Sequence, residues 1–574
     1  MSSSNRTSIT RLAVILVVGL LVGGGAIYLA APSLVGASTT TQTQTSIQTV
    51  TTGSTVVTLG TPTITQTTTE TTISTSTVTA PNVQVSTVST QTAPSKGNTG
   101  WGNAWTSEFI LSLAAEFTNS SQGPAAWDAA AHPDVYITTN TIGGGDFSAT
   151  ASGTGLCIID AITQQVVVCR QYSVAGITNY FGAMGSAVSM DGRYIYLPTM
   201  NEGYTNAAQS GMTFVIDART LLVHQIIYSE GAPHHCAAFR LYNGTDVVDC
   251  YTDGTSGGAP RTANDTTPVL TAFWIMNPTK DNEVIGGVST ATLQAPYYLA
   301  FAGPDGQHLF MGTRTQTTGF GTINLNSFSS TGEIMVVDMS TWQPVKYYAS
   351  MGSDVVWCSI TADGHYTYCD DATSDTIMKI DNVQQLEVGA LRAGTYAPYG
   401  MVLNYNQTEL IVTGKGEAGG QFGKTYGVVN LASMTPVAQV TLPTPVQDID
   451  HVLLNPFNVQ QVWGSSNSGG GATGQLAFAA PGLNVGPFGD ISFNTVTNTF
   501  GSEIVHSGSS HNGAFVSYTV NPDGTWTGQM QSDHNGLHGP ALVTQLSKLG
   551  ITQVVYGSQT YKTEAQRALP GEEP

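Results

Sequence analysis

The segment WCSITADGHYTYC, residues 357–369, carries the pattern on which the fold depends. Asp363 and Gly364 form one of the dipeptides that most strongly favour a two-residue β-hairpin turn. Counting outward from this turn places Cys358 opposite Cys369. Residues that face each other in an antiparallel pair hold their Cα atoms about 4.5–5.5 Å apart, which is within disulfide reach. The segment therefore predicts a β-hairpin closed by a disulfide.

The other four cysteines follow the same plan. The segments CIIDAITQQVVVC (157–169) and CAAFRLYNGTDVVDC (236–250) each begin and end with a cysteine around a polar turn. Each predicted disulfide closes a loop short enough to contribute about 2–3 kcal/mol to the free energy of unfolding in the chain-entropy model. Because disulfides persist in oxidising compartments, we expect the hairpins outside the cytoplasm, and the alternative is six unrelated buried thiols. The predicted pairs are Cys157–Cys169, Cys236–Cys250 and Cys358–Cys369.

Residues 1–36 predict a targeting segment. Residues 12–31, LAVILVVGLLVGGGAIYLAA, are apolar over about the length that spans a bilayer, and Arg6 and Arg11 precede them. Positive charges before such a helix place the N-terminus inside and the rest of the chain outside. We favour a retained membrane anchor, and cleavage as a signal peptide near Ala37 is the alternative. Either way the protein is expected at the cell surface or secreted.

Residues 37–100 predict a stalk, because they are almost entirely Thr, Ser, Gln and Val. They show no helical period and too little apolar bulk for a core, so we expect a disordered, extended and O-glycosylated segment. A β-rich tail of one long domain is the alternative. Such a stalk after a membrane helix resembles surface proteins of thermoacidophilic archaea. Possible N-glycosylation sites follow at Asn119, Asn243, Asn264 and Asn406.

Charge is sparse and acidic in this chain. Charged residues make up 10% of it, with 18 Lys and Arg against 38 Asp and Glu. No basic patch is available for nucleic acid, so we exclude that class of partner. In acid the carboxylates lose their charge, and a chain with few basic residues then avoids self-repulsion. The composition favours an acid-exposed secreted domain, and a glycosylated surface protein at neutral pH is the alternative.

A strand–turn–strand unit recurs along residues 101–574. Each copy has an apolar pair, an Asp or Asn and a polar turn before a second apolar strand, as in IMKIDNVQQLEVGAL, residues 377–391. The Asx side chain bonds the backbone two residues on and thereby sets the turn. The Asx residues are Asp160, Asp217, Asn277, Asp338, Asp381 and Asn430, with weaker copies near Ala480 and Asn521.

A second hairpin unit precedes each copy, so that four short strands recur every 40–60 residues or so, which is the period of a propeller blade. We therefore predict an all-β fold for residues 101–574, a β-propeller of eight blades, with seven as the alternative. Closure of the ring is expected to join the strand near residues 108–117 to residues 553–561. Helical periodicity is almost absent beyond the membrane segment.

The paired pattern resembles a known superfamily. An apolar-Ser-x-Asp-Gly-x-apolar hairpin, as in GSAVSMDGRYIYL (185–197), is followed by apolar-Val-Asp-x-x-Thr, as in IMVVDMSTWQPVKYY (334–348). This pattern resembles the YVTN-type and quinoprotein-like β-propellers over about residues 101–560. The resemblance implies the fold and says little about function, because propellers host many chemistries.

The innermost strand of each propeller blade starts near the central channel. The residues at this rim position are Met184, His235, Tyr298, Trp357, Tyr399, His451, His511 and His538. Close to them in the sequence are His234, Asp354, Asp450, His506 and His534. The simplest interpretation is that these side chains only bond channel water.

A second interpretation is a site for a small anionic substrate, bound by His234 and the rim residues other than Met184. Imidazoles are protonated below pH about 6 and would attract a dianion into the channel. Asp354, or as second choice Asp450, would act as a general acid or base. A secreted, acid-adapted propeller of this kind resembles the tetrathionate hydrolases of acidophiles. The resemblance implies hydrolysis of the S–S bond of tetrathionate to thiosulfate, sulfate and sulfur, without a cofactor.

Two further interpretations remain. Neutral imidazoles suit copper, and a multi-His ring in a propeller looks like nitrous oxide reductase. This chain lacks the cupredoxin domain of that family, and metal binding needs deprotonated imidazoles, which an acidic medium denies. The last interpretation is a non-catalytic surface propeller that binds cell-surface glycans or further copies of itself.

Overall fold

The computed structural model describes most of the chain beyond residue 40. The described residues are 41–57, 64–79, 83–88, 111–114, 127–140, 154–174, 185–200, 211–229, 231–256, 272–289, 297–313, 333–349, 351, 355–372, 374–395, 398–414, 416–417, 421–422, 425–441, 449–466, 489–505 and 510–567. The expected membrane helix at residues 12–31 and the cleavage site near Ala37 lie outside them. Within these ranges no helix is long and apolar enough to cross a membrane.

The chain divides into two compact units, Met1–Ala80 and Pro81–Pro574. In the first unit, β1 (Thr41–Val57) and β2 (Ile64–Thr79) pair as a long antiparallel hairpin. We had expected a disordered stalk here. The β-branched Thr, Val and Ile residues of this segment favour a pleated strand, which is consistent with the pairing of the two stretches.

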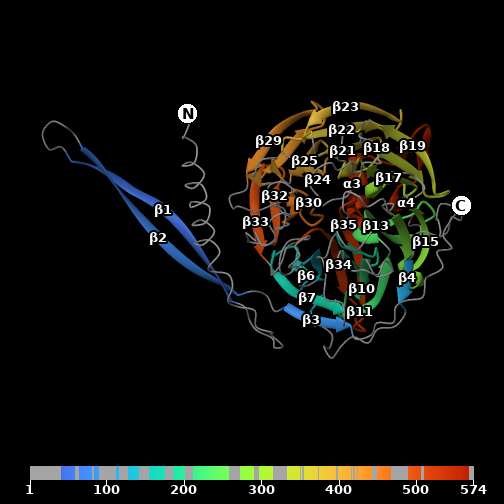
Figure 1. Ribbon diagram of the computed structural model, residues 1–574, viewed down its shortest axis with the longest axis horizontal. Coiled ribbons are helices and arrows are strands. Elements are labelled where there is room, and N and C mark those ends of the chain that lie inside the picture. The colour runs from blue at the N-terminus through green and yellow to red at the C-terminus, as the bar shows by residue number, and fades with distance from the viewer. Residues whose placement is uncertain are drawn as a thin grey trace, which may run out of the picture. The chain divides into compact units, whose positions relative to one another are not determined.

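The second unit holds a β-propeller of seven four-stranded blades, arranged as a circle in Figure 1. The strands of each blade are given in the order in which they pair. The first three blades are β34 (Gly513–Val520), β5 (Asp134–Thr139), β6 (Thr154–Asp160) and β7 (Val166–Val174); β8 (Ala187–Val188), β9 (Tyr194–Met200), β10 (Gly211–Asp217) and β11 (Val223–Ser229); and β12 (Gly231–Arg240), β13 (Asp246–Ser256), β14 (Ala272–Asn277) and β15 (Glu283–Ser289), with the 3-10 turn η2 (Pro278–Lys280).

The other four blades follow in chain order. They are β16 (Tyr297–Ala302), β17 (His308–Thr313), β18 (Glu333–Asp338) and β19 (Gln343–Ala349); β20 (Cys358–Ile360), β21 (Tyr366–Asp371), β22 (Thr376–Asp381) and β23 (Leu386–Arg392); β24 (Pro398–Leu403), β25 (Glu409–Gly414), β28 (Thr425–Asn430) and β29 (Thr435–Thr441); and β30 (Ile449–Leu454), β31 (Gln461–Ser466), β32 (Gly489–Asn494) and β33 (Thr499–Val505). A small hairpin of β26 (Gly416–Glu417) and β27 (Gln421–Phe422) adjoins the sixth blade in sequence.

The propeller has seven blades, which was our alternative, and not eight. The difference arises because the ring closes differently from our expectation. The C-terminal strand β34 is the fourth strand of the first blade, where Gly513 pairs with Thr138 of β5, and β35 extends the same sheet beyond β34. A Cβ atom on Gly513 would overlap the carbonyl oxygen of Ile137, so glycine permits this close pairing. We had counted β34 as part of a separate eighth blade.

The segments expected to close the ring have other places. Within residues 108–117, β4 (Leu111–Ala114) pairs with the outer strand β11 of the second blade. Residues 553–561 contain β37 (Val554–Tyr556) and β38 (Gln559–Tyr561), which form a hairpin of their own. Another N-terminal strand, β3 (Val83–Val88), pairs in parallel with β7 at the edge of the first blade.

The Asx turns between outer strands are confirmed. Oδ1 of Asp381 accepts hydrogen bonds from the backbone N–H groups of Val383 and Gln384, at 2.9 and 2.8 Å. The turn after β32 uses Asn494 in the same way. Of the two weaker copies, Ala480 lies outside the described residues, and Asn521 begins the turn between β34 and β35 (Trp526–Asp533).

All three predicted disulfides are present, Cys157–Cys169, Cys236–Cys250 and Cys358–Cys369, each with its Cα atoms 4.1 Å apart. In every case the two cysteines are direct cross-strand partners. These disulfides are consistent with an extracellular location.

We expect the double substitution Cys358→Ser, Cys369→Ser to lower the free energy of unfolding by about 2–3 kcal/mol, because the unfolded chain regains the entropy of an open loop. The measurement is the midpoint of denaturant unfolding compared with that of the unaltered protein. An unchanged midpoint would contradict a structural role for this disulfide.

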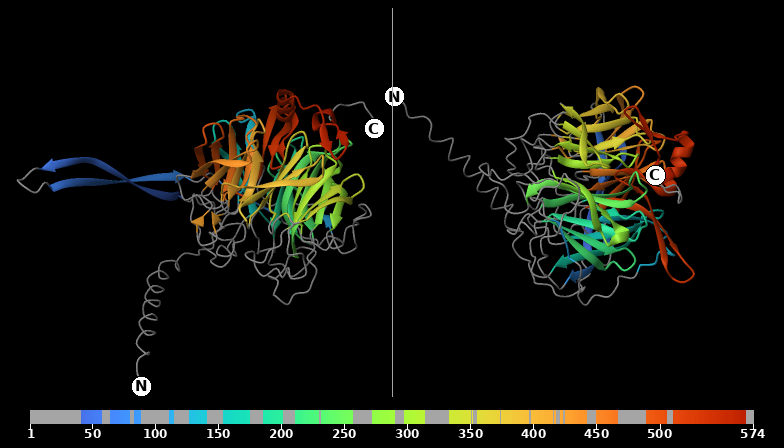
Figure 2. Two further views of the ribbon diagram at one scale, coloured as in Figure 1. Left: turned by 90° about the horizontal axis from the view of Figure 1, so that it is seen from above. Right: turned by 90° about the vertical axis from the view of Figure 1, so that its right-hand side faces the viewer.

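The C-terminal residues form a compact layer on one side of the propeller, red in Figure 2. They contain β36 (Gly536–Leu537), α3 (Gly539–Leu549), the β37–β38 hairpin and α4 (Glu564–Arg567). Helix α3 has a proline in its first turn and ends at Gly550, whose positive φ of 68° suits glycine. The layer is bonded to the hairpin turns of the blades: Val555 N–H donates to Asp363 O at 2.8 Å, and Gln545 Nε2 donates to Tyr405 O at 2.9 Å.

Candidate functional site

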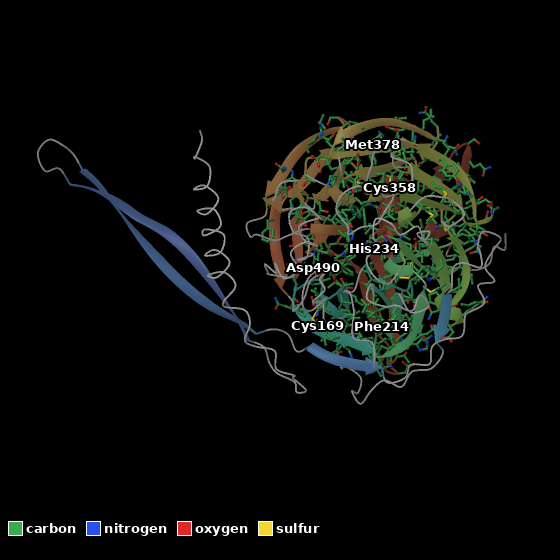
Figure 3. All side chains as sticks on the ribbon, viewed as in Figure 1. Cys169, Phe214, His234, Cys358, Met378 and Asp490 are labelled. Carbon is green, nitrogen blue, oxygen red and sulfur yellow. A yellow bond between two sulfur atoms is a disulfide. The ribbon has the colours of Figure 1, made fainter. Side chains whose placement is uncertain are left out.

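Five histidines from distant parts of the sequence meet at the centre of the ring. They are His234 and His235 in β12, His451 in β30, His511 just before β34 and His534 just after β35. Each is at most 4% exposed. Figure 3 shows His234 near the centre of the circle of blades.

An irregularity in β12 brings two consecutive imidazoles to the same place. Consecutive side chains of a regular strand point to opposite faces. The register shifts between Pro233 and His235, so that two residues on β12 oppose a single step on β13. Such a bulge re-aims a side chain, and the rings of His234 and His235 end with their centroids 4.4 Å apart.

The imidazole nitrogens converge. Nε2 of His511 lies 3.0 Å from Nε2 of His451 and 3.0 Å from Nε2 of His235. Ligand atoms of His234, His235 and His511 all lie within 4.8 Å of one another. The four rings therefore present nitrogen atoms to one small volume.

Aromatic rings and backbone enclose this cluster. The ring of Trp357 stacks on His451 with centroids 4.2 Å apart, and Tyr251 stacks on His235 at 5.6 Å. Gly185 lies so close that a Cβ atom there would overlap Nδ1 of His235. The walls are thus largely apolar and leave the imidazoles out of contact with bulk solvent.

Burial lowers the pKa of His235 well below 6.5, and the neighbouring imidazoles lower it further. Burial also lowers the pKa of His534 to about 4, although the carboxylate of Asp533 acts in the opposite direction. These two imidazoles therefore stay neutral at the pH of about 6 at which we had expected protonation to begin.

Two buried carboxyl groups flank β12 next to the cluster. Asp249 accepts from the N–H of Ala237 at 2.7 Å, and Asp533 accepts from the N–H of Ala238 at 3.2 Å. Burial raises the pKa of Asp249 well above 3.8, and the charge of Asp533 adds to this effect. Asp249 is thus a neutral acid at pH values where an ordinary carboxyl is ionised.

Asp533 has a different environment because it belongs to a buried triad. The ring of His538 forms one hydrogen bond from Nε2 to Asp533 Oδ1, at 2.8 Å, and another from Nδ1 to Glu564 Oε2, at 3.0 Å. Burial acts to lower the pKa of His538, but the two carboxylates outweigh it and raise the pKa to about 10. Burial acts to raise the pKa of Asp533, and the imidazolium of His538 outweighs it and lowers that pKa.

The structure unites most of the rim residues and separates others. His234, His235, Trp357, Tyr399, His451 and His511 lie together at the centre. His538 pairs instead with Asp533 and Glu564. Asp354, Met184 and His506 lie outside the described residues, and for Tyr298 in β16 and Asp450 in β30 only the backbone is described.

The sequence reasoning missed Asp249, Asp533, Tyr251 and Glu564. The register of the predicted Cys236–Cys250 hairpin offered a signal for two of them, because Tyr251 faces His235 and Asp249 faces Ala237 in that register. Asp533 and Glu564 had no such signal, since their partner His538 is reached only through the folded C-terminal layer.

No protein-family profile matches the sequence, and no curated protein shows significant sequence similarity to it. Solved structures match this chain only at low similarity. Dihydro-heme d1 dehydrogenase NirN is 10% identical with a TM-score of 0.39, covering 74% of this chain and 78% of its own. A functionally unknown protein from Desulfotomaculum acetoxidans is 11% identical with a TM-score of 0.40, covering 66% of this chain and 97% of its own.

Hydrazine synthase from Kuenenia stuttgartiensis is 15% identical with a TM-score of 0.28 over 39% of this chain. This chain spans 56% of the length of that chain. All three TM-scores are too low to support a functional comparison.

Proposed function

We propose that the protein is an extracytoplasmic metal-binding propeller, in which His235, His451 and His511 hold a copper ion through their Nε2 atoms. The observation that carries this proposal is the convergence of these three nitrogens, in two pairs at 3.0 Å, at the buried centre of the ring. Buried polar groups need partners, and a metal ion can satisfy several imidazole lone pairs at once.

The donor set favours copper among the common ions. The cluster offers imidazole nitrogens without a thiolate, since all six cysteines are in disulfides. Copper has the highest affinity for nitrogen sites among the divalent first-row ions, and neutral imidazoles also suit it well. His234 lies within reach as a further ligand. A bound copper ion would supply one-electron chemistry.

The surrounding residues would orient the ligands and exclude water. The stacked Trp357 holds the ring plane of His451, and its Nε1 is itself fixed by donating to Met401 O at 3.0 Å. Tyr251 does the same for His235 by stacking at an interplanar angle of 10°. Groups behind the ligands commonly decide the geometry of a metal site.

The test is to equilibrate the full chain with Cu(I), Cu(II) or Zn(II), remove free ion by gel filtration, and measure the metal retained per chain. One tightly held copper ion per chain supports the proposal. Retention of zinc in preference to copper would correct the identity of the metal. Retention of neither ion would overturn the proposal.

A second candidate function is hydrolysis of a small sulfur oxyanion, of the kind catalysed by tetrathionate hydrolases. The observation that favours it is the pair Asp249 and Asp533, whose environments push their pKa values in opposite directions. Carboxyls separated in this way are suited to act as general acid and general base. Here Asp249 takes the role that we had assigned to Asp354 or Asp450.

We expect Asp249→Asn to lower any turnover of tetrathionate about 10²–10⁴-fold, the usual contribution of a general acid. The measurement is release of thiosulfate by metal-free protein at acidic pH. Asp523→Asn, which alters an exposed turn, is the matched control. Absence of turnover in the unaltered protein, or equal rates in the two variants, would remove this candidate.

A further inference from the structure

A cavity of about 80 Å³ lies between the propeller and its C-terminal layer. One wall is formed by strand ends of the blades, including Phe239, Ala302 and Val402, and the other by residues 534–538 with α3 and α4. His534 belongs to this wall, and its ring centroid also lies 5.7 Å from that of His235. The cavity therefore adjoins the imidazole cluster through His534, and the described lining includes none of the proposed copper ligands.

Three buried polar groups that line this cavity lack hydrogen-bond partners among the described residues. They are both ring nitrogens of His534, the side-chain amide of Asn535 and Nε of Arg567. A buried donor without a partner costs about 1–3 kcal/mol, so three around one cavity require an explanation. All three groups can donate a hydrogen bond, and a ligand rich in acceptor atoms would satisfy them together.

The charges around the cavity favour an anion. Arg240, His538 and Arg567 are positive, and Glu564 is the one carboxylate among the described lining residues. Arg240 is already paired with Asp246 through two hydrogen bonds of 2.6 and 2.9 Å.

His538 is likewise paired, with Asp533 and Glu564. Arg567 differs from both cations. Within the described residues it donates to the carbonyl oxygens of Pro304, Lys562 and Arg240 and forms no ion pair. Burial lowers the pKa of Arg567 to about 10, although the charges of Glu564 and Asp305 act in the opposite direction. A buried guanidinium that contacts only carbonyl oxygens is costly, and an anion in direct contact would offset that cost.

We propose that this cavity binds a small inorganic oxyanion such as sulfate, held by Nε of Arg567, the amide of Asn535 and the ring of His534. The volume is that of a few water molecules and suits an ion of about five non-hydrogen atoms. A guanidinium and two uncharged donors are typical partners for the oxygens of such an ion. The proposal does not depend on whether the imidazole cluster holds a metal.

The test is calorimetric titration of the metal-free full chain with sodium sulfate. Saturable binding at one site per chain is expected. Arg567→Gln should weaken it about 10-fold or more, because it removes one charge-assisted hydrogen bond. Arg193→Gln, which removes an exposed guanidinium of the second blade, should leave the affinity unchanged.

Arg567 also bonds the backbone of two blades, so its replacement could disturb the C-terminal layer. Asn535→Ala provides an independent variant, because the side chain of Asn535 has no hydrogen-bond partner in the described part of the chain, and it should weaken sulfate binding several-fold. Thermal unfolding of each variant shows whether it is folded. Absence of saturable binding in the unaltered protein, or an unchanged affinity in both folded variants, would overturn the proposal.

Discussion

Replacing His511 by glutamine is expected to weaken copper binding at least about 100-fold. His511 is the ligand that lies 3.0 Å from both His451 and His235, so it occupies the middle of the proposed donor set. Loss of a group that merely supports a ligand costs about 10–100-fold in metal affinity, and loss of the ligand itself should cost more. The measurement is competition for Cu(I) against a chelator of known affinity.

His224→Gln is the matched control for this experiment. His224 is 38% exposed, faces Asp281 and lies in β11, an outer strand of the second blade. It should retain copper like the unaltered protein. Equal loss of copper from both variants would mean that the metal binds elsewhere, for instance to exposed histidines, and would contradict the assignment.

Replacing His538 by glutamine is expected to lower the free energy of unfolding by about 3–5 kcal/mol, the usual cost of breaking a buried ion pair. The substitution leaves Asp533 and Glu564 buried without their shared cation. It also loosens α4, since Glu564 begins this helix and accepts from the N–H of Gly539 at 3.2 Å. The measurement is thermal or denaturant unfolding near pH 6.

The same triad predicts how stability depends on pH. The pKa of His538 is raised from 6.5 to about 10 in the folded protein, so its contribution is complete below pH 6.5 and is lost as the pH rises toward 10. The pKa values of Asp533 and Glu564 are lowered from 3.8 and 4.5, so their contributions are complete above these values and are lost in stronger acid. The contribution of the triad is therefore greatest between about pH 4.5 and 6.5.

A series of unfolding midpoints from acid to alkali checks this dependence. In the unaltered protein the unfolding midpoint should decrease as the pH is raised from 6.5 to 10. In His538→Gln this alkaline decrease should be much smaller. His365→Gln serves as the control, because His365 is 37% exposed and is not part of the triad. Parallel declines in both variants would show that the triad does not govern alkaline stability.

The local units of the propeller could be read from the sequence. The Asp363-Gly364 turn sets the register that pairs Cys358 with Cys369, and the Asx residues set the turns of the outer hairpins. In each case the interacting groups are within about 15 residues of one another, and side chains adjacent to the turn determine the geometry. The three disulfides were predicted in the same way, by counting residues outward from each turn.

Closure of the ring and the blade count needed the folded structure. The inner strand β34 resembles the start of one more blade, and only its pairing with β5, more than 370 residues away, shows that the ring is already complete. Long-range pairing of this kind leaves no periodic signal in the sequence, because either strand could pair with several other strands. Gly513, which permits the close approach, is one of 64 glycines in the chain.

The candidate site divides in the same way. Rim histidines and Trp357 were found from the position at which each inner strand begins, since that position repeats with the blade. The protonation state of the imidazoles could not be found in this way, because it depends on how closely the rings approach one another and on their burial. The carboxyl pair Asp249 and Asp533 was also missed, since it arises from two elements on either side of β12.

The sequence by itself determined the hairpins, their turns and their disulfides, because these depend on neighbours along the chain. The tertiary structure decided that the ring has seven blades, that imidazoles from three blades share one volume, and that the C-terminal layer places Arg567 in the wall of a cavity beside the blades. Those features depend on distances between residues far apart in sequence, and only folding of the whole ring sets such distances.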